Sequence, residues 1–378
     1  MLLLKVTSNE MAFFSKIFGG GTDETSVLGI DIGSSAIKIV QIKKKHGQAV
    51  LETYGELALG PYGGHGIGQA VVLPIEKISE AVSDLLKEKE VNITTNKCGL
   101  SIPFTSSLMS LVEMPKVSEK QLAVMVPIEA RKYIPVPVSE VMLDWSVIPR
   151  VDNRNEEAVT PGQTPKIDVL LVAIHNETIS RYKEIVNKTA LDAGFFEIEI
   201  FSTMRAVLDD TLAPIMIVDM GAASTKIYIV ERGIVRVSHT INRGSQDITL
   251  TLSKSLGIAP DKAEIMKREL GLIGGDKNFT EVISLTLDFI FAEANRVLLS
   301  YEKKYNKAVS KVVMVGGGSA LKGLAKLAEL NFKTPSETGD PFNKVSSPAF
   351  LDKILKETGP EFAVAIGLAL RRLAEEEN

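Results

Sequence analysis

The sequence predicts a two-lobed α/β protein, and three observations support that fold class. The chain has 378 residues, about twice the length of an ordinary domain. In each half, segments with the pattern of strands come first and segments with the pattern of helices follow. A motif at 30–39 is repeated, with substitutions, at 218–227.

The composition excludes several classes of protein. Hydrophobic residues make up 45% of the chain and charged residues 24%, which excludes a disordered or collagen-like chain. The 43 basic and 47 acidic residues give a formal net charge of −4, so we expect no nucleic-acid partner. The single cysteine, Cys98, excludes an intrachain disulfide and agrees with a cytoplasmic location. No apolar run approaches the roughly 20 residues that cross a bilayer, so we expect no direct membrane span.

The first half of the chain begins with predicted strands. The apolar segment at 11–18 is too short to cross a membrane, and we expect it to pack loosely before a flexible lead-in at 19–26. In the expected order, there are strands at 27–32, 36–43 and 52–59, a loop at 60–68, a helix at 75–90 and a strand at 98–102.

The middle of the chain has a different local pattern. We expect a strand at 107–114, a helix at 118–133, strands at 141–151 and 166–175 with a polar loop at 152–165 between them, and a helix at 176–193. Pro135 and Pro137 end the first helix, because neither donates a backbone hydrogen bond, and Gly194 stops the second. The block at 105–173 is therefore predicted to be an inserted subdomain.

The second half repeats the order of strands and helices. We expect strands at 215–219, 225–231 and 233–238, a helical region at 246–305 broken at 271–276, a strand at 311–315, and helices at 319–330 and 361–374. The first lobe is predicted to comprise 26–104 and 174–212. The second is predicted to comprise 213–247 and 312–374, with 248–311 as its helical subdomain.

The repeated motif is an apolar strand that ends in aspartate, then glycine and small residues, then a second strand. Hairpin tips of this kind present backbone N–H groups to phosphate oxygens. Carboxylates repel phosphate, so Asp31 and Asp219 are predicted to hold Mg²⁺ between themselves and the phosphates, through water. A single Asp-x-Gly turn carries little information, whereas two matching copies favour function over plain turns. The expected phosphate contacts are Gly33, Ser34, Ser35 and Lys38 in the first copy, and Gly221, Ala222, Ala223 and Ser224 in the second.

A third element follows the strand at 311–315. Gly316, Gly317, Gly318 and Ser319 form a triple-glycine turn on which a nucleotide can rest, with a helix N-terminus directed toward its phosphates. The turn matches neither the P-loop nor the dinucleotide fingerprint. It gains specificity only as the third element after two Asp-x-Gly hairpins.

These three elements resemble the actin-like ATPase superfamily, and the resemblance extends over about 26–372. It implies a fold of duplicated ribonuclease-H-like domains that binds ATP with Mg²⁺. The hairpins are then the two phosphate loops and the triple glycine the adenosine loop. The resemblance also implies that Glu264 points toward the ribose hydroxyls and Lys267 lies along the base. The alternative for these two residues is an ordinary surface ion pair at i,i+3.

Within the superfamily, the inserted block is similar to that of the FtsA and PilM families. The segments at 129–137 (Glu-Ala-Arg-Lys-Tyr-Ile-Pro-Val-Pro) and 140–145 look like the PilM pattern, as do 13–18, 340–345 and 363–371. FtsA proteins end in an amphipathic membrane-binding helix, whereas this chain ends with Glu375, Glu376 and Glu377 before a final asparagine. The sequence is therefore identified as a member of the PilM family of type IV pilus proteins.

That resemblance implies a cytoplasmic ATP-binding scaffold of the pilus inner-membrane complex. Such a scaffold binds the N-terminal cytoplasmic tail of a PilN-like membrane protein, in a groove between the first and inserted subdomains. It links this protein to the pilus motor components and is peripheral to the inner membrane through its partner. Self-association is left open. The candidate apolar anchors, which could equally be subdomain core, are Leu108, Leu111, Val112, Met114, Ile128, Tyr133 and Ile134.

Hydrolysis requires a group that positions the attacking water. The resemblance places it in the segment that connects the halves, where Glu199 is the candidate and Glu197 the alternative, both on one face of a predicted strand. Two other functions remain open: an FtsA-like division ATPase, and a small-molecule kinase for which Asp144 is the only candidate base. No metal-ligand spacing relates the four histidines, His46, His65, His175 and His239.

Overall fold

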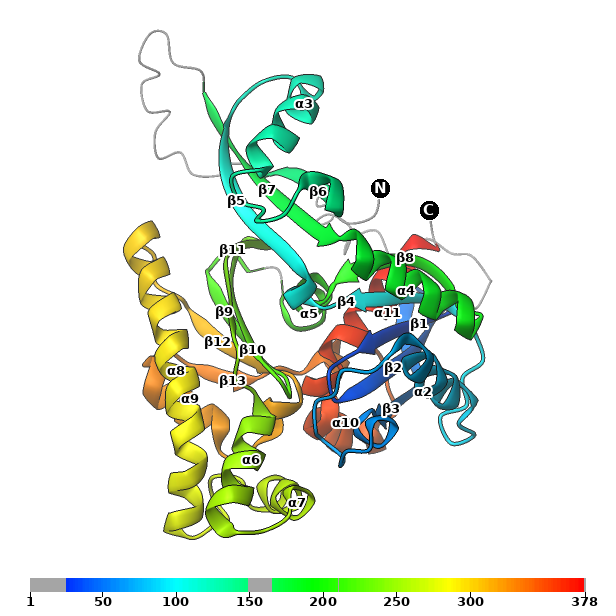
Figure 1. The fold of residues 1–378 in the computed structure, drawn as a ribbon, viewed down its shortest axis with the longest axis vertical. Helices are drawn as coiled ribbons and strands as arrows, with labels where there is room; N and C mark the ends of the chain where they lie inside the picture. Colours follow the sequence, from blue (N-terminus) through cyan, green and yellow to red (C-terminus); the bar gives the residue numbers. More distant parts are fainter. Residues whose placement is uncertain (1–24, 149–164, 210, 377–378) are drawn as a thin grey trace. The chain divides into compact units, whose positions relative to one another are not determined.

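The computed structural model describes residues 25–148, 165–209 and 211–376, and these form two compact units (Figure 1). The larger unit comprises 25–101 and 185–376, and the smaller one 102–184. The inserted subdomain was predicted at 105–173. The apolar segment at 11–18, nearly all of the lead-in and most of the polar loop at 152–165 lie outside the described residues.

Two five-stranded sheets organise the larger unit, and they confirm the two-lobed α/β prediction. The first sheet has the order β3-β2-β1-β4-β8, and the second has the order β11-β10-β9-β12-β13. We call each sheet with its helices the first and the second lobe. The strands of the first are β1 (Ser26–Ile32), β2 (Ala36–Lys45), β3 (Gln48–Ala58), β4 (Lys97–Ile102) and β8 (Asp192–Ile198). Those of the second are β9 (Ile215–Met220), β10 (Thr225–Glu231), β11 (Ile234–Ile241), β12 (Lys311–Val315) and β13 (Ser336–Thr338).

The two sheets share one pattern of pairing, so the sequence repeat is also a structural repeat. In each, a central strand pairs antiparallel with the next strand and parallel with a later one: β1 with β2 and β4, and β9 with β10 and β12. The registers agree as well. Asp31 lies opposite Lys38, and Asp219 lies opposite Lys226.

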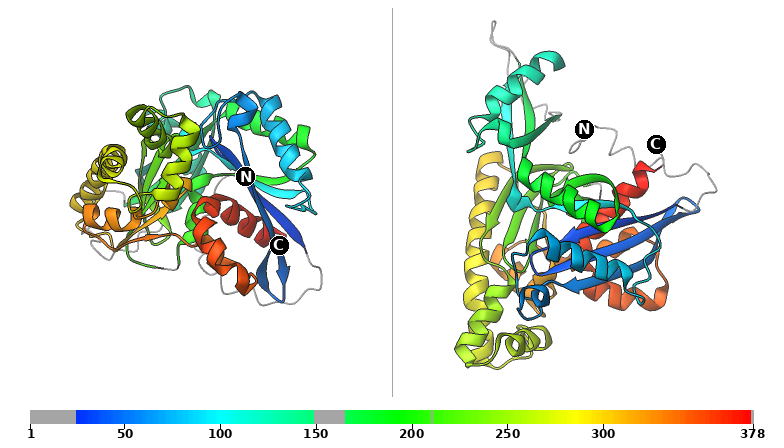
Figure 2. Two further views of the ribbon diagram at one scale, coloured as in Figure 1. Left: turned by 90° about the horizontal axis from the view of Figure 1, so that it is seen from below. Right: turned by 45° about the vertical axis from the view of Figure 1, so that its right-hand side comes forward.

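Helices follow the strands in each lobe. The helices of the larger unit are α2 (Ile75–Lys87), α5 (Glu199–Val207), α6 (Ser245–Leu256), α7 (Pro260–Leu270), α8 (Lys277–Tyr305), α9 (Leu324–Phe332), α10 (Asp352–Thr358) and α11 (Ala363–Glu375), and α4 (Asn176–Thr189) continues from the smaller unit. Figures 1 and 2 both show α6 and α7 beside the N-terminal end of the long helix α8.

Several predicted boundaries were wrong, and three of these errors lie near the segments discussed below. The helix expected at 176–193 ends at Thr189, because Ala190 takes a left-handed conformation, and Gly194 lies within β8. The strand expected through 195–201 ends at Ile198, and Glu199 is the first residue of α5. The helix expected directly after the triple glycine begins only at Leu324, after a short 3₁₀ turn.

The C-terminal helix α11 packs against the first lobe at two glycines. A Cβ on Gly29 of β1 would collide with the carbonyl oxygen of Ala365, and one on Gly367 would collide with that of Ser202 in α5. These positions let the backbone of α11 lie directly on β1 and on α5, an approach that any side chain would prevent. The first sheet and the helix that begins at Glu199 are thereby fixed to each other.

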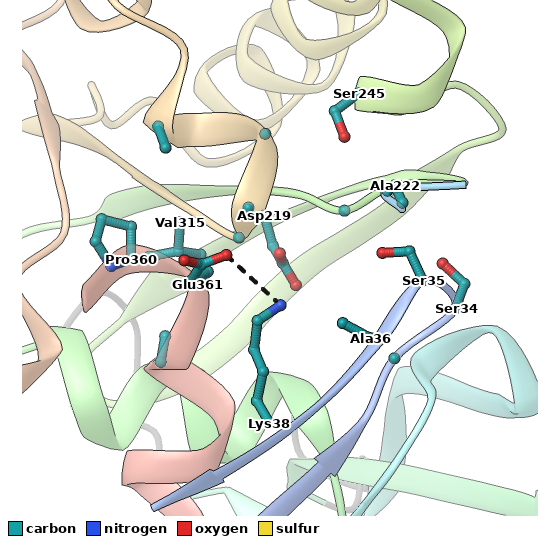
Figure 3. Close-up of a pocket in the computed structure, with 18 of the residues that line it drawn as sticks. Ser34, Ser35, Ala36, Lys38, Asp219, Ala222, Ser245, Val315, Pro360 and Glu361 are labelled. Carbon is teal, nitrogen blue, oxygen red and sulfur yellow. Dashed lines mark ion pairs between the residues drawn. The ribbon is translucent and has the colours of Figure 1, made fainter. Parts of the chain in front are cut away.

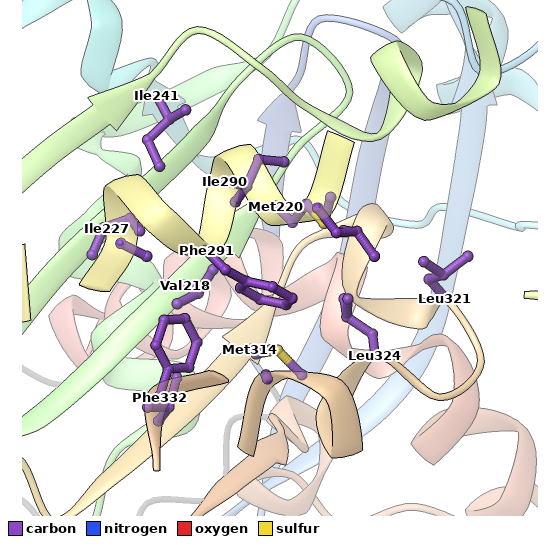
Figure 4. Close-up of a cluster of buried hydrophobic side chains, with 14 of the residues drawn as sticks. Val218, Met220, Ile227, Ile241, Ile290, Phe291, Met314, Leu321, Leu324 and Phe332 are labelled. Carbon is purple, nitrogen blue, oxygen red and sulfur yellow. The ribbon is translucent and has the colours of Figure 1, made fainter. Parts of the chain in front are cut away.

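One apolar core lies between the second sheet and its helices (Figure 4). Val218, Ile227 and Met314 from the sheet are buried against Ile290 and Phe291 of α8. Phe332 of α9 closes the cluster, with its ring edge-on to Phe291 at 5.3 Å between centroids. The Asp-x-Gly hairpin and the triple glycine lie at ends of strands that this core holds in place.

The smaller unit has a core of its own. Its sheet has the order β5-β7-β6, from β5 (Ser107–Pro115), β6 (Val141–Ile148) and β7 (Lys166–His175), and α3 (Glu119–Ala130) completes the unit. Leu122, Val126 and Ala130 of α3 pack on one face of this sheet. Ser118 begins the helix with a capping box. The helix predicted at 118–133 ends three residues earlier, at Ala130.

Candidate nucleotide-binding site

A cavity of about 300 Å³ lies within the larger unit, between the two hairpins and the triple glycine (Figure 3). It is lined by all but one of the predicted nucleotide contacts. These are Asp31, Gly33, Ser34, Ser35, Lys38, Glu199, Asp219, Gly221, Ala222, Ala223, Ser224, Glu264, Lys267, Gly316, Gly317 and Gly318. Ser319 does not line the cavity, because its hydroxyl donates to the carbonyl of Gly316 at 2.7 Å and holds the turn.

Both hairpin tips are closed by the same hydrogen bond. The N–H of Gly33 donates to the carbonyl of Ala36 at 3.0 Å, and that of Gly221 donates to the carbonyl of Ser224 at 3.0 Å. The carbonyl of Ala222 is taken by the N–H of Gln246 at 3.0 Å. Carbonyl oxygens repel phosphate, and here they accept hydrogen bonds from within the protein. The hairpin tips are therefore suitable for binding an anion.

The two aspartates occupy equivalent places in different surroundings. Asp31 accepts a hydrogen bond from Ser101 at 2.7 Å, and burial raises the pKa of its carboxyl group against the opposing effects of this bond and of Lys38. Asp219 is buried, with an oxygen 3.4 Å from the ammonium nitrogen of Lys226. Both carboxylates line the cavity that the hairpins enclose.

Lys226 is one of the site residues that the sequence analysis missed. Its ammonium nitrogen lies 2.8 Å from a carboxylate oxygen of Glu199. Although burial opposes its charge, Asp219 and Glu199 raise the pKa of Lys226, so it is an ammonium ion at neutral pH. The repeat contained the signal, because Lys226 follows Asp219 at the spacing at which Lys38 follows Asp31.

Glu199 is placed in the cavity by the start of α5 and not by a strand. Burial raises the pKa of its carboxyl group, and the charges of Asp219 and Asp31 add to this effect while Lys226 opposes it. A carboxyl group with a raised pKa is a better general base than an ordinary one, which agrees with the role predicted for Glu199. The alternative candidate Glu197 does not line the cavity.

Glu197 instead forms a buried ion cluster. It accepts two hydrogen bonds from Arg205, at 2.8 and 2.9 Å, one from Arg371 at 2.7 Å, and a short one from Ser202. These partners outweigh burial and lower the pKa of Glu197 to about 2. The cluster ties α5 to α11, so Glu197 has a structural role.

Lys38 extends toward a second acidic pair from elsewhere in the chain. Its ammonium nitrogen is 3.5 Å from Glu56 and 3.8 Å from Glu361, and Figure 3 shows Lys38 facing Glu361 and Asp219. Glu361 follows the strand and turn of the triple glycine by more than forty residues, so no local pattern indicated it. The part of the cavity around the two hairpins thus combines two ammonium groups with five carboxylates. The ammonium groups are those of Lys38 and Lys226, and the carboxylates are those of Asp31, Glu56, Glu199, Asp219 and Glu361.

This excess of carboxylates suits a divalent cation. Mg²⁺ prefers oxygen ligands and keeps several waters when protein carboxylates and phosphates hold it. Among the described residues there is no cluster of three or more His, Cys, Asp or Glu side chains that could bind a metal ion by themselves. The donor set is therefore compatible with Mg²⁺ held through water by Asp31 and Asp219 in the presence of phosphates.

The part of the cavity predicted to hold adenosine is built around Glu264. Lys267 lies 2.6 Å from one of its oxygens and Arg268 donates to the other at 2.7 Å, while Thr249 donates at 2.5 Å. Glu264 and Lys267 do form the ion pair at i,i+3 that the alternative predicts, but each is only 7% exposed, so the pair is buried and does not lie on the surface. Opposite them, a Cβ on Gly317 would meet only Glu361, at 3.5 Å, which leaves space above the turn.

Asp144, the candidate base for a kinase, lies on β6 in the smaller unit. Its carboxylate accepts the N–H of Trp145 at 2.8 Å, and it does not line the cavity. In the part of the chain that the structure describes, no helix combines the length and the apolar character that crossing a membrane requires.

Comparison with known proteins adds a family and a fold. Residues 29–373 match the family described as type IV pilus assembly protein PilM. Among curated proteins, the cell division protein FtsA of Neisseria meningitidis serogroup B is 24% identical over 325 residues, covering 78% of this chain and 77% of that protein.

Solved structures show the same fold. A PilM–PilN type IV pilus biogenesis complex has a chain that is 23% identical, with a TM-score of 0.76 and coverage of 93% of this chain and 99% of that one. The ethanolamine utilization protein EutJ of Carboxydothermus hydrogenoformans is 14% identical with a TM-score of 0.55, and the match covers 93% of this chain and 91% of that one. An MreB protein of Spiroplasma citri bound to AMPPNP is 12% identical with a TM-score of 0.52, and the match covers 94% of this chain and 98% of that one. The fold is therefore the two-lobed actin-like one.

Proposed function

The chain belongs to the PilM family of type IV pilus assembly proteins, and from this premise we propose that it is an ATP-binding scaffold of the pilus inner-membrane complex. One observation carries the nucleotide part of this proposal: two equivalent Asp-x-Gly hairpins, from opposite halves of the sequence, line one cavity together with the triple glycine. The MreB protein of similar fold is bound to AMPPNP in its solved structure, which supports the choice of an adenine nucleotide.

In this proposal each lobe contributes the same set of groups to the phosphates. The hairpin N–H groups and the ammonium groups of Lys38 and Lys226 bind phosphate oxygens. Asp31 and Asp219 hold the hydration shell of Mg²⁺, which supplies positive charge against the phosphates. The cavity at Gly317 accepts the adenosine, next to Glu264 and Lys267.

Hydrolysis, where it occurs, depends on Glu199. When a bound phosphate also contacts Lys226, the carboxylate of Glu199 is able to accept a proton from the attacking water. Glu199→Gln keeps the size of the side chain and removes the basic oxygen. We therefore expect this variant to bind ATP and to lose any turnover of ATP measured by phosphate release. Glu197→Gln alters a side chain that does not line the cavity, so it should keep its turnover at a temperature at which the variant is folded.

The partner is proposed to be the cytoplasmic tail of a PilN-like inner-membrane protein, through which the scaffold lies at the membrane and reaches the motor. The solved structure of similar fold is a PilM–PilN complex, which supports this choice. Of the candidate anchors, Val112, Met114 and Ile134 belong to the core of the smaller unit. Ile128 and Tyr133 are 58% and 46% exposed and are available to a peptide.

A peptide that copies this tail tests the partner. We expect it to bind the full chain and to bind Ile128→Asp at least tenfold more weakly, because an apolar anchor is lost. Leu330→Asp, which places the same charge at an exposed leucine (69%) on α9, is the matched control. Equal affinity of both variants and the wild type would exclude the α3 surface as the binding site.

A second candidate function is suggested by the FtsA relative, namely a division ATPase of the same fold. The same peptide separates the two, because a division protein has no reason to recognise a pilus membrane protein. A kinase would show fast ATP turnover that depends on one member of a panel of sugars, and a scaffold would not.

A further inference from the structure

A glycine-rich segment crosses between the lobes beside the cavity. Residues 59–73, which we call the strap, connect β3 with α2 in the first lobe. At its two ends the strap is bonded to the first hairpin: the N–H of Leu59 donates to the carbonyl of Ser35 at 2.8 Å, and that of Val71 to the carbonyl of Ser34 at 2.9 Å. The strap is thus an extension of the first phosphate hairpin.

Next to Val71, the strap is bonded to the second lobe. The N–H of Ala70 donates to the side-chain oxygen of Gln246 at 2.5 Å, and the backbone N–H of Gln246 donates to the carbonyl of Ala222 at 3.0 Å. A continuous path therefore leads from Ser34 in one hairpin, through Val71, Ala70 and Gln246, to Ala222 in the other. Gln246 thus links the two hairpins, with its side chain on the strap and its backbone N–H on the second hairpin.

Two glycines let the strap lie directly on α7. A Cβ on Gly66 would overlap with the carboxylate of Asp261, and one on Gly68 would lie 3.1 Å from the carboxylate of Glu264. Gly68 also lines the cavity. The strap therefore lies against the residue predicted to face the ribose, at the side of the cavity where the two lobes meet.

Leu59 and Leu73 anchor the two ends of the strap in the apolar core, at 2% and 6% exposure, whereas the part between them is held mainly by polar contacts and by close backbone approach. Ile67 is 63% exposed and Val72 is 96% exposed, so neither side chain anchors it in a core. A segment with few buried apolar contacts opens at low free energy while the rest of the fold stays intact. The strap has the properties of a part that opens and closes.

We propose that Gln246 is a positioning residue that fastens the strap across the cavity, and that a bound nucleotide leaves when the Ala70–Gln246 contact breaks. This inference rests on the proposed binding of ATP. Gln246 itself does not line the cavity, so it acts on the nucleotide through the strap.

The first test is the rate of nucleotide release. Gln246→Ala removes the acceptor for the N–H of Ala70, and we expect N-methylanthraniloyl-ATP with Mg²⁺ to dissociate about tenfold faster in stopped-flow displacement, the effect of one lost hydrogen bond. Gln246→Glu keeps an acceptor oxygen at the same place and restores the slow release. A purely structural role would instead lower the thermal stability of Gln246→Ala without this rescue of the rate.

The second test locks the strap. A Cβ at position 66 would lie 2.7 Å from Cγ of Asp261. The Cβ of Asp261 is one bond, about 1.5 Å, from that Cγ, so the two Cβ atoms would lie within about 4.2 Å of each other, as a disulfide requires. In Gly66→Cys/Asp261→Cys, oxidation after loading should slow the release of the labelled ATP more than tenfold, and reduction should reverse it. The native Cys98 does not compete, because it is fully buried and burial raises its pKa to about 12.

The outcomes separate this inference from the proposed function. If the wild type takes up no labelled ATP, the proposed function is wrong and the inference with it. If the wild type binds ATP but Gln246→Ala and the oxidised double variant release it at the wild-type rate, only the inference is overturned. It is overturned as well if the two cysteines do not form a disulfide, because the strap then does not lie on α7.

Discussion

Lys226 and Glu199 form a buried ion pair, with 2.8 Å between the ammonium nitrogen and a carboxylate oxygen, where both side chains line the cavity. The same lysine lies opposite Asp219 in the β9–β10 ladder, as Lys38 lies opposite Asp31 in the β1–β2 ladder. Each lobe thus delivers one aspartate and one lysine to the cavity from facing positions of a hairpin. Only the lysine of the second lobe also binds the candidate general base.

The ion pair predicts a role for Lys226 in distinguishing ATP from ADP. Lys226→Met removes a charge-assisted contact to phosphate, which is worth about 2 kcal/mol, and the affinity for ATP should fall about 30-fold. The affinity for ADP should fall less, because Lys226 lies beside Glu199 and so nearer to where a terminal phosphate is attacked. Calorimetric titration with both nucleotides measures this, with Lys277→Met, at a solvent-exposed lysine on α8, as the control. Equal losses for ATP and ADP would contradict it.

Asp31 and Asp219 are predicted to carry the dependence on Mg²⁺. In Asp31→Asn and Asp219→Asn, nucleotide affinity should become nearly independent of Mg²⁺ while the circular dichroism spectrum is unchanged, since both residues lie at strand ends. Unaltered Mg²⁺ dependence in both variants would disprove the assignment.

A pH dependence follows from Asp31. The ionised carboxylate holds the hydrated cation, and burial raises the pKa of Asp31 above the ordinary 3.8. Mg²⁺-dependent affinity should therefore be complete at neutral pH and be lost as the pH falls through this raised pKa, at a higher pH than for an ordinary aspartate. Titrations over a pH series, with Asp31→Asn as the pH-insensitive comparison, check the direction.

The triple glycine predicts opposite effects at neighbouring positions. A side chain at Gly317 extends into the cavity, where it would meet only Glu361, so Gly317→Val should fold normally and bind adenine nucleotides at least tenfold more weakly. A Cβ at Gly318 would lie 2.5 Å from Cγ of Met220 in the core, so Gly318→Val should lower the melting temperature instead. Thermal unfolding and nucleotide titration of both variants separate the two effects.

Glu197 is predicted to matter for stability. Glu197→Gln leaves Arg205 and Arg371 without their buried carboxylate and should cost about 3 kcal/mol of unfolding free energy at neutral pH. Glu375→Gln, which removes only the exposed partner of Arg371, should cost less than about 1 kcal/mol.

The loss at Glu197 should depend on pH with a known sign. Because the folded pKa is about 2 and the ordinary value is 4.5, the stabilisation is complete above 4.5 and is lost between 4.5 and about 2. Urea unfolding at pH 7 and at pH 3.5 should show a smaller difference between wild type and Glu197→Gln at the lower pH. A difference that grows in acid would contradict this account.

Local pattern was sufficient for most of the strands and for both hairpins. The Asp-x-Gly turns at Asp31 and Asp219 were visible because they are encoded within a few residues and occur twice. The start of α5 was not, because alternating glutamates after Phe195 and Phe196 favour a strand, and the contact of Ser202 with Gly367 of α11 overrides that preference.

Contacts between distant segments were beyond the reach of the sequence. Glu361 meets Lys38 only because α11 and the turn before it return to the first lobe. The strap was predicted as a plain loop, since glycine-rich segments have no periodicity that would indicate a contact with α7. The pairing of Lys226 with Glu199 likewise requires both lobes to be in place.

The packing of α11 has a consequence for how the protein is made. Gly29 in the first strand lies against Ala365 of α11, and the whole second lobe up to β13 is translated between these two residues. The first lobe therefore remains without one of its layers while the strands and helices of the second lobe leave the ribosome. A nascent chain halted after β8 should expose the apolar surface of β1 and β2 to chaperones, and truncations before α11 should accumulate as insoluble protein.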